Sequence, residues 1–210
     1  TVSGHRDLEE GTARARDALL HELFIWVGQN LDEYSLSKLF LELGYALRGR
    51  AEVGLWERLR KALPKTEAWI EDHFWEKLHT EAKGAVYDIS VLAALNRSDL
   101  LALLPKPDLA ERWHGLAIAD LGALLQSVYG ETKGGIILDR NPSSQGGRQS
   151  LEVGDIIVRV GNRFTSDSSS VRRLLTLNSR GRKPFDILYV RGFEEPRKTR
   201  LTPPSAGGRR

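Results

Sequence analysis

The sequence predicts an α+β protein in which an all-helical N-terminal bundle precedes a β-rich domain. Apolar residues recur at helical spacing in the first half, and short β-rich runs bounded by turn residues replace them in the second half. The charge changes at the same place. Residues 1–111 carry 14 Lys and Arg against 19 Asp and Glu, whereas residues 112–210 carry 17 against 9. Pro105 and Pro107 interrupt the chain between the two halves.

Two apolar stripes define the first helices. The first stripe consists of Leu19, Leu23, Trp26 and Val27. The second consists of Leu36, Leu39, Phe40, Leu43 and Leu47. Ser35 is placed to cap the second helix. Gly44 either weakens the end of that helix or lets a neighbour pack closely.

Four further helices are expected before the prolines. A third helix is predicted over residues 55–63, and a fourth begins after Thr66. The inward residues of the fourth helix are Ile70, Phe74 and Leu78. Two shorter helices follow at 88–95 and 98–104. Together these signals predict a bundle of helices over residues 1–104.

The second half has strand signals around one helix. Strands are expected at 134–138, 155–160, 185–190 and 199–201. Gly161 and Asn162 supply a turn, and a helix is expected over 168–177. Residues 105–111 are expected to form a linker, 112–203 a domain and 204–210 a disordered tail.

This order of signals resembles a PDZ domain, in the bacterial form found behind trypsin-like proteases of the HtrA type. The resemblance depends on Trp113–Ile118, on the short helix and strand that follow, and on the leucine–x–x–glycine–aspartate–apolar signature at 151–156. It covers residues 112–203 and implies a partly open β-barrel or sandwich with two helices.

A PDZ domain adds its ligand as an extra strand at an exposed sheet edge and binds the ligand carboxylate in a loop. The resemblance implies a carboxylate loop formed by Trp113, His114, Gly115 and Leu116. It implies a binding edge formed by Leu116, Ala117 and Ile118. The facing helix would contribute Ser168, Val171, Arg172 and Leu175. His114 stands where the family has an apolar residue. Ser168 replaces the histidine with which animal PDZ domains read a ligand Ser or Thr, so an apolar ligand end is expected.

The resemblance implies a non-enzymatic adaptor that captures a protein C-terminus or an extended segment, acidic or apolar-ended. The helical domain would add a second contact, with another protein or with a second copy. An alternative is a regulatory or scaffold subunit of a larger protease assembly, with the groove occupied by its own partner or its own chain. No signal peptide is visible in the polar N-terminus. Cytoplasm and bacterial cell envelope therefore both remain open.

Catalytic and metal chemistry find little support in the sequence. Residues 146–150 lack the glycine-flanked serine of a trypsin-like oxyanion turn, and cysteine is absent. Glu76 and His79 would share one face of a helix, but a second Glu-x-x-His pair is missing. We therefore expect no catalytic residue, no metal and no cofactor.

Nucleic acid and membrane are also disfavoured as partners. The basic clusters at 172–173, 180–183 and 197–200 attract phosphate, but this half has few aromatic rings on which bases could stack. A basic rim that steers acidic peptides accounts for the same charges. No apolar run approaches the ~20 residues of a membrane helix.

Overall fold

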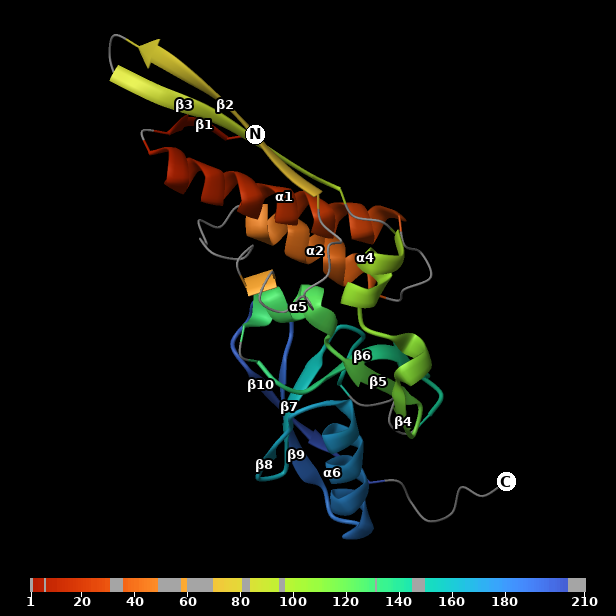
Figure 1. The fold of residues 1–210 in the computed structure, drawn as a ribbon. Helices are drawn as coiled ribbons and strands as arrows, with labels where there is room; N and C mark the ends of the chain where they lie inside the picture. Colours follow the sequence, from red (N-terminus) through yellow and green to blue (C-terminus); the bar gives the residue numbers. More distant parts are fainter. Residues whose placement is uncertain are drawn as a thin grey trace. The chain divides into compact units, whose positions relative to one another are not determined.

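The computed structural model is shown in Figure 1. It describes residues 2–5, 7–30, 36–48, 58–59, 70–80, 84–94, 97–130, 132–144 and 150–203. Helices and antiparallel sheets are both present, which confirms the α+β class. Backbone contacts divide the chain into two compact units. The first comprises Thr1–Asn30, Phe40–Leu104 and Ala123–Gly130, and the second comprises Leu31–Leu39, Pro105–Gly122 and Glu131–Arg210.

Two packed helices, α1 (Leu8–Asn30) and α2 (Ser37–Arg48), belong mainly to the first unit. The carboxylate of Asp7 caps α1 by accepting the backbone N–H groups of Glu9 and Glu10 at 2.8 and 3.0 Å. The rings of Phe24 and Phe40 lie 5.8 Å apart between the two helices. A Cβ atom at Gly44 would lie 2.6 Å from Ile25 Cγ1. Gly44 therefore allows close helix packing, one of its two predicted roles.

The second predicted stripe is confirmed, because all five of its residues are buried. The first is only partly right. Val27 is buried as predicted, but Trp26 is 46% exposed, and the buried face of α1 also carries Leu20 and Phe24. In a long helix rich in apolar residues, the repeat of 3.6 residues allows more than one apolar stripe to be drawn. Packing against α2 and the following sheet decides between them.

A three-stranded sheet replaces two of the predicted helices. Strands β2 (Ile70–Thr80) and β3 (Gly84–Ala94) pair antiparallel along their whole length, and β1 (Val2–His5) pairs with the other side of β3. The helix predicted to begin after Thr66 is therefore wrong over residues 70–80, and the helix predicted at 88–95 is wrong over residues 88–94. Apolar positions four apart fit one face of a strand as well as one face of a helix. The alternation of Tyr87, Ile89 and Val91 with polar residues follows the period of a strand.

The rest of the first unit is helical. Helix α4 (Arg97–Leu103) lies within one residue of the helix predicted at 98–104. The helix predicted at 55–63 lies outside the described residues except for Arg58 and Leu59, which are helical. The Arg58 side chain donates from Nε to the carbonyl of Ser127 at 2.8 Å. Ser127 belongs to α5 (Gly122–Tyr129), most of which groups with this unit. Residues 1–104 are thus mixed α and β, and the all-helical prediction is wrong.

The second unit is built on an antiparallel sheet. Its strands are β4 (Glu111–Trp113), β5 (Leu116–Asp120), β6 (Gly135–Arg140), β7 (Ile156–Val160), β8 (Arg163–Phe164), β9 (Phe185–Val190) and β10 (Arg197–Leu201). A short 3-10 helix (Pro107–Leu109) precedes β4. The strand order is β10-β9-β7-β6-β5-β4, with β8 paired to β7. Each strand predicted from the sequence is found, with shifts of at most two residues at its ends.

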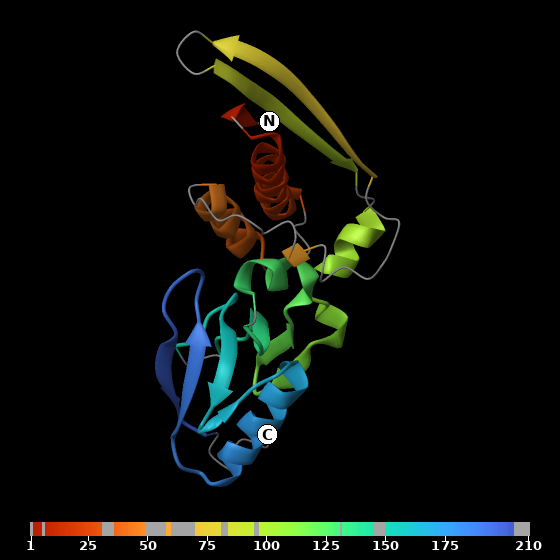
Figure 2. The same ribbon diagram turned by 60° about the vertical axis from the view of Figure 1, so that its left-hand side comes forward.

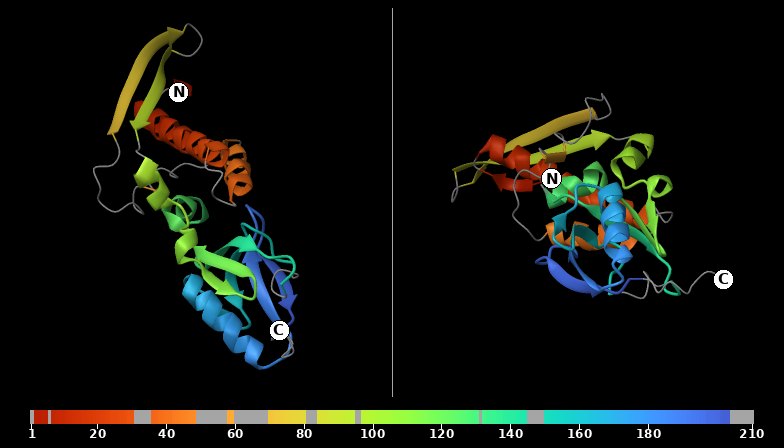
Figure 3. Two further views of the ribbon diagram at one scale, coloured as in Figure 1. Left: turned by 90° about the vertical axis from the view of Figure 1, so that its right-hand side faces the viewer. Right: turned by 90° about the horizontal axis from the view of Figure 1, so that it is seen from below.

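Helix α6 (Ser168–Arg180) covers one side of this sheet near β4 and β5, as Figures 2 and 3 show. It begins at the predicted residue and continues three residues beyond 177. A buried cluster joins the helix to the sheet. Its members include Trp113, Leu116, Ile118, Ile157, Val171, Leu174, Leu175 and Ile187. This packing places α6 near the edge of the sheet that β4 forms.

Candidate peptide-binding groove

The predicted carboxylate loop is the turn of a tight β-hairpin. Strands β4 and β5 pair antiparallel with Trp113 opposite Leu116 and Glu111 opposite Ile118, so only His114 and Gly115 lie between the strands. Both have positive φ, 42° for His114 and 88° for Gly115. Two-residue hairpins of type I′ require this backbone, because its twist matches that of the strands.

The predicted binding edge is therefore not exposed. Leu116, Ala117 and Ile118 pair with β4 on one side and with β6 on the other. The prediction of a free edge at these residues is wrong. It failed because β4 has only three residues and begins four positions after Pro107, so Glu111 was assigned to the linker. The residue pattern apolar–His–Gly–apolar at 113–116 was the available hairpin signal.

Gly115 is held against a second turn. Its carbonyl accepts the backbone N–H of Asn141 at 2.8 Å. A Cβ atom at this position would lie 1.9 Å from Ser144 Oγ and 2.3 Å from Ser144 Cβ. Gly115 thus has a structural role in the hairpin, in addition to any contact with a ligand.

We expect Gly115→Ala to lower the free energy of unfolding of the second unit by about 2 kcal/mol or more, because it adds backbone strain and a steric clash. Gly192→Ala is the matched control, since Gly192 has φ 55° and nothing within 4 Å of an added Cβ. The control should lose only about 1 kcal/mol. Urea denaturation of both variants measures the difference, and equal losses would refute the clash with Ser144.

The start of α6 is fixed by a capping box. The Asp167 carboxylate accepts the backbone N–H of Ser170 at 2.6 Å, and the Ser170 hydroxyl in turn accepts the backbone N–H of Asp167 at 3.1 Å. Hydrogen bonds from the Ser166 hydroxyl and from the Ser170 N–H lower the pKa of the Asp167 carboxyl. The Ser168 N–H donates to the Asp120 carboxylate at 2.8 Å. This bond ties the first turn of α6 to the end of β5.

The predicted groove wall on α6 divides into two parts. Val171 and Leu175 are fully buried, and Ser168 is nearly so. Arg172 is different, because its side chain is 53% exposed and its Nε lies 2.7 Å from Glu111 Oε2. The Ser169 hydroxyl also donates to the Glu111 carboxylate, at 3.1 Å. Sequence reasoning missed both Glu111 and Ser169.

Trp113 packs against the inner face of α6. It is 5% exposed and belongs to the same buried cluster as Val171 and Leu175. Its indole Nε1 is buried and has no hydrogen-bond partner among the described residues. Strand β4 therefore contributes a buried ring and a paired carboxylate to the space between β5 and α6. Of the ten predicted site residues, five share one buried cluster: Trp113, Leu116, Ile118, Val171 and Leu175. Gly115 lies against Ser144 instead.

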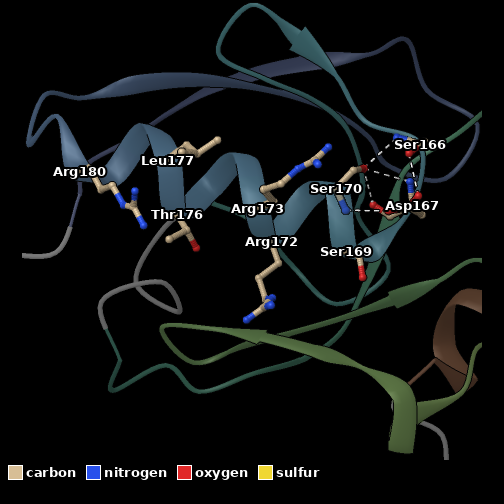
Figure 4. Close-up of a pocket in the computed structure, with 9 residues that line it drawn as sticks. All are labelled: Ser166, Asp167, Ser169, Ser170, Arg172, Arg173, Thr176, Leu177 and Arg180. Atoms are coloured by element: carbon tan, nitrogen blue, oxygen red, sulfur yellow. Dashed lines mark hydrogen bonds between the residues drawn. The ribbon is translucent and has the colours of Figure 1, made fainter.

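A shallow hollow of about 500 Å³ runs along α6, and its lining includes Ser169 and Arg172, which contact Glu111 (Figure 4). Arg173, Leu177 and Arg180 contribute to its lining. In Figure 4, Arg172 extends toward the green ribbon of β4 and β5, whereas Arg173 points away from it. Both arginines line the hollow, but only Arg172 also contacts β4, through its ion pair with Glu111.

A buried ion pair joins Asp155, in the signature at residues 151–156, to Arg191. Asp155 is fully buried, and its carboxylate accepts Nε and Nη2 of Arg191 at 2.7 and 2.8 Å. The Glu152 N–H donates to the same carboxylate at 2.7 Å. The Asp155 hydrogen bond is the main cause that raises the pKa of Arg191 above its usual value. The sequence placed Asp155 in the signature at 151–156 and gave no sign of its partner 36 residues away.

Other kinds of site were also considered. Among the described residues, no group of three His, Asp or Glu side chains is placed to hold a metal ion. None of the helices in the described ranges combines the length and apolar character that crossing a bilayer requires. Comparison with known protein families and with curated proteins finds no match for this chain.

Proposed function

We propose that the second unit is a non-enzymatic peptide-binding module of the PDZ type, which captures a protein C-terminus or an extended segment between β5 and α6. The observation that carries this proposal is the position of β4. A three-residue antiparallel strand of the chain itself lies where the resemblance expects a ligand strand, beside Leu116–Ile118 and against α6. The site accepts an extended strand, which is the shape of the proposed ligand.

The groove offers both elements of peptide recognition. The backbone of β5 gives hydrogen bonds that do not depend on sequence, and pockets along α6 select side chains. In the present structure β4 uses both. An external ligand must therefore displace β4, and the closed form competes with binding.

The occupied groove also favours a second candidate function. A strand that stays in the groove would make the unit a closed scaffold, such as a regulatory subunit of a larger assembly. The two candidates differ in one property. A displaceable strand gives a site whose affinity depends on β4, whereas a permanent one gives no peptide site at all.

Weakening β4 tests the proposal. The full-length chain and its Glu111→Ala variant are titrated by calorimetry with a library of peptides that have free C-termini. The variant loses the contacts of Glu111 with Arg172 and Ser169, so we expect it to bind about threefold to tenfold more tightly. Glu194→Ala removes another exposed glutamate that is paired with an arginine, Arg197, and should leave affinity unchanged.

Each result discriminates between the candidates. Tighter binding by Glu111→Ala alone supports a displaceable strand. Equal binding by the intact chain and the variant would show that β4 does not compete. No binding by any form would overturn the peptide-binding proposal and favour the closed scaffold.

A further inference from the structure

Strand β4 contains a pattern of side chains that its site selects. Successive residues of a strand point to opposite sides, so Glu111 and Trp113 share one side and Arg112 lies on the other. Arg112 is exposed, whereas Glu111 and Trp113 contact the groove. Any strand that occupies this site therefore has two side chains, two residues apart, that face α6.

The Glu111 position suits a carboxylate. Its side chain is 29% exposed and receives Arg172 Nε at 2.7 Å and the Ser169 hydroxyl at 3.1 Å. Both donors come from the first turns of α6, where the helix dipole also favours negative charge. No acidic residue occurs in α6 between Ser168 and Arg180. Glu111 is the residue that neutralises Arg172 among the described residues.

The Trp113 position suits a large apolar ring. The side chain is almost completely buried with Val171 and Leu175 and stacks edge-on against His114, with ring centroids 5.0 Å apart. The described residues offer no acceptor to its indole N–H. The pocket therefore selects size and apolar character and does not read the indole nitrogen.

We propose that β4 shows which ligands this groove binds: protein segments with an acidic residue two positions before a large aromatic residue. This inference rests on the proposed function. A ligand that replaces β4 places its acidic residue opposite Ile118, against Arg172 and Ser169, and its aromatic residue opposite Leu116. Arg172 and Ser169 are then the residues that determine specificity at the acidic position.

The test is a charge reversal at this position. Peptides of equal length that end in Glu-Arg-Trp, Gln-Arg-Trp, Lys-Arg-Trp or Glu-Arg-Ala are titrated into the full-length chain at low ionic strength. The same titrations use Arg172→Glu and the matched control Arg173→Glu, whose side chain points away from the groove. Comparing peptides within one protein cancels the competition from β4, because β4 affects all four peptides equally.

The intact chain should bind the peptide ending in Glu-Arg-Trp about tenfold more tightly than the one with Lys at the acidic position. The peptide with Gln should lie between them, and the peptide ending in Ala should bind most weakly. Arg172→Glu should reverse the preference so that Lys binds better than Glu. Arg173→Glu should keep the original order.

Failure of the inference is distinguishable from failure of the function. If the peptides bind but Arg172→Glu does not change their order, the ligand pattern is overturned while peptide binding stands. Reversal by both arginine variants would show a general attraction to basic charge, which also overturns the pattern. If no peptide binds the intact chain or the Glu111→Ala variant, the proposed function itself is overturned.

Discussion

Replacing Asp155 with alanine should lower the free energy of unfolding of the second unit by about 3 kcal/mol. The substitution removes both hydrogen bonds from Arg191 and leaves the Glu152 N–H without its acceptor. The guanidinium stays charged at every accessible pH, because its pKa is raised and not lowered. Arg191 is 27% exposed and keeps a contact with Glu152 at 3.0 Å, so the loss should lie near the lower end for buried ion pairs.

The loss is measured by urea denaturation, with hydrogen exchange of β7 and β9 as the readout specific to this unit. Asp186→Ala is the control, because its carboxylate pairs with Lys198 and Arg200 at the surface. The control should cost much less than Asp155→Ala, because solvent screens its ion pairs. Similar losses of unfolding free energy from the two substitutions would mean that the buried Asp155–Arg191 pair is no more stabilising than a surface ion pair.

Removing the ring of Trp113 should have a comparable effect. Trp113→Ala empties a buried site between β4 and α6, and such truncations cost about 3–5 kcal/mol. Leu177→Ala removes a side chain of α6 that is 44% exposed and should cost less than about 1 kcal/mol. Chemical denaturation of the two variants gives the difference.

A further substitution separates packing from hydrogen bonding. Trp113→Phe keeps an aromatic ring and removes an indole N–H that has no partner among the described residues. We expect a loss well below that of Trp113→Ala, because a buried donor without an acceptor itself costs about 1–3 kcal/mol. A loss from Trp113→Phe as large as that from Trp113→Ala would show that the indole N–H is satisfied in solution.

Local patterns were sufficient for most of the second unit. The alternation at 185–190 predicted β9 with its true ends, and Ser168 marked the first residue of α6. The hairpin of β2 and β3 was missed because apolar spacing of four is shared by helix and strand. Only pairing with a neighbour resolves that ambiguity, and pairing is not visible in a single segment.

The resemblance predicted which segments lie side by side, but not that β4 would pair with β5. The resemblance brought together Trp113–Ile118 and the inner face of α6, and the structure places these side by side. It gave no sign that Glu111 would pair with Arg172, because 61 positions separate the two residues. Long-range pairs such as this one and Asp155–Arg191 depend on the register of the sheet, which tertiary packing decides.

If the second unit binds peptides as proposed, the two-residue turn at His114 and Gly115 affects how binding depends on ligand concentration. A strand tethered so closely to its own site is present there at an effective concentration of millimolar or higher. If the closed form is ten times more populated than the open form, the apparent dissociation constant of every free ligand rises about tenfold. A segment must then be present at about ten times the local concentration to reach the same occupancy. Under the proposed function, the hairpin therefore sets a threshold of local ligand concentration below which the site stays closed.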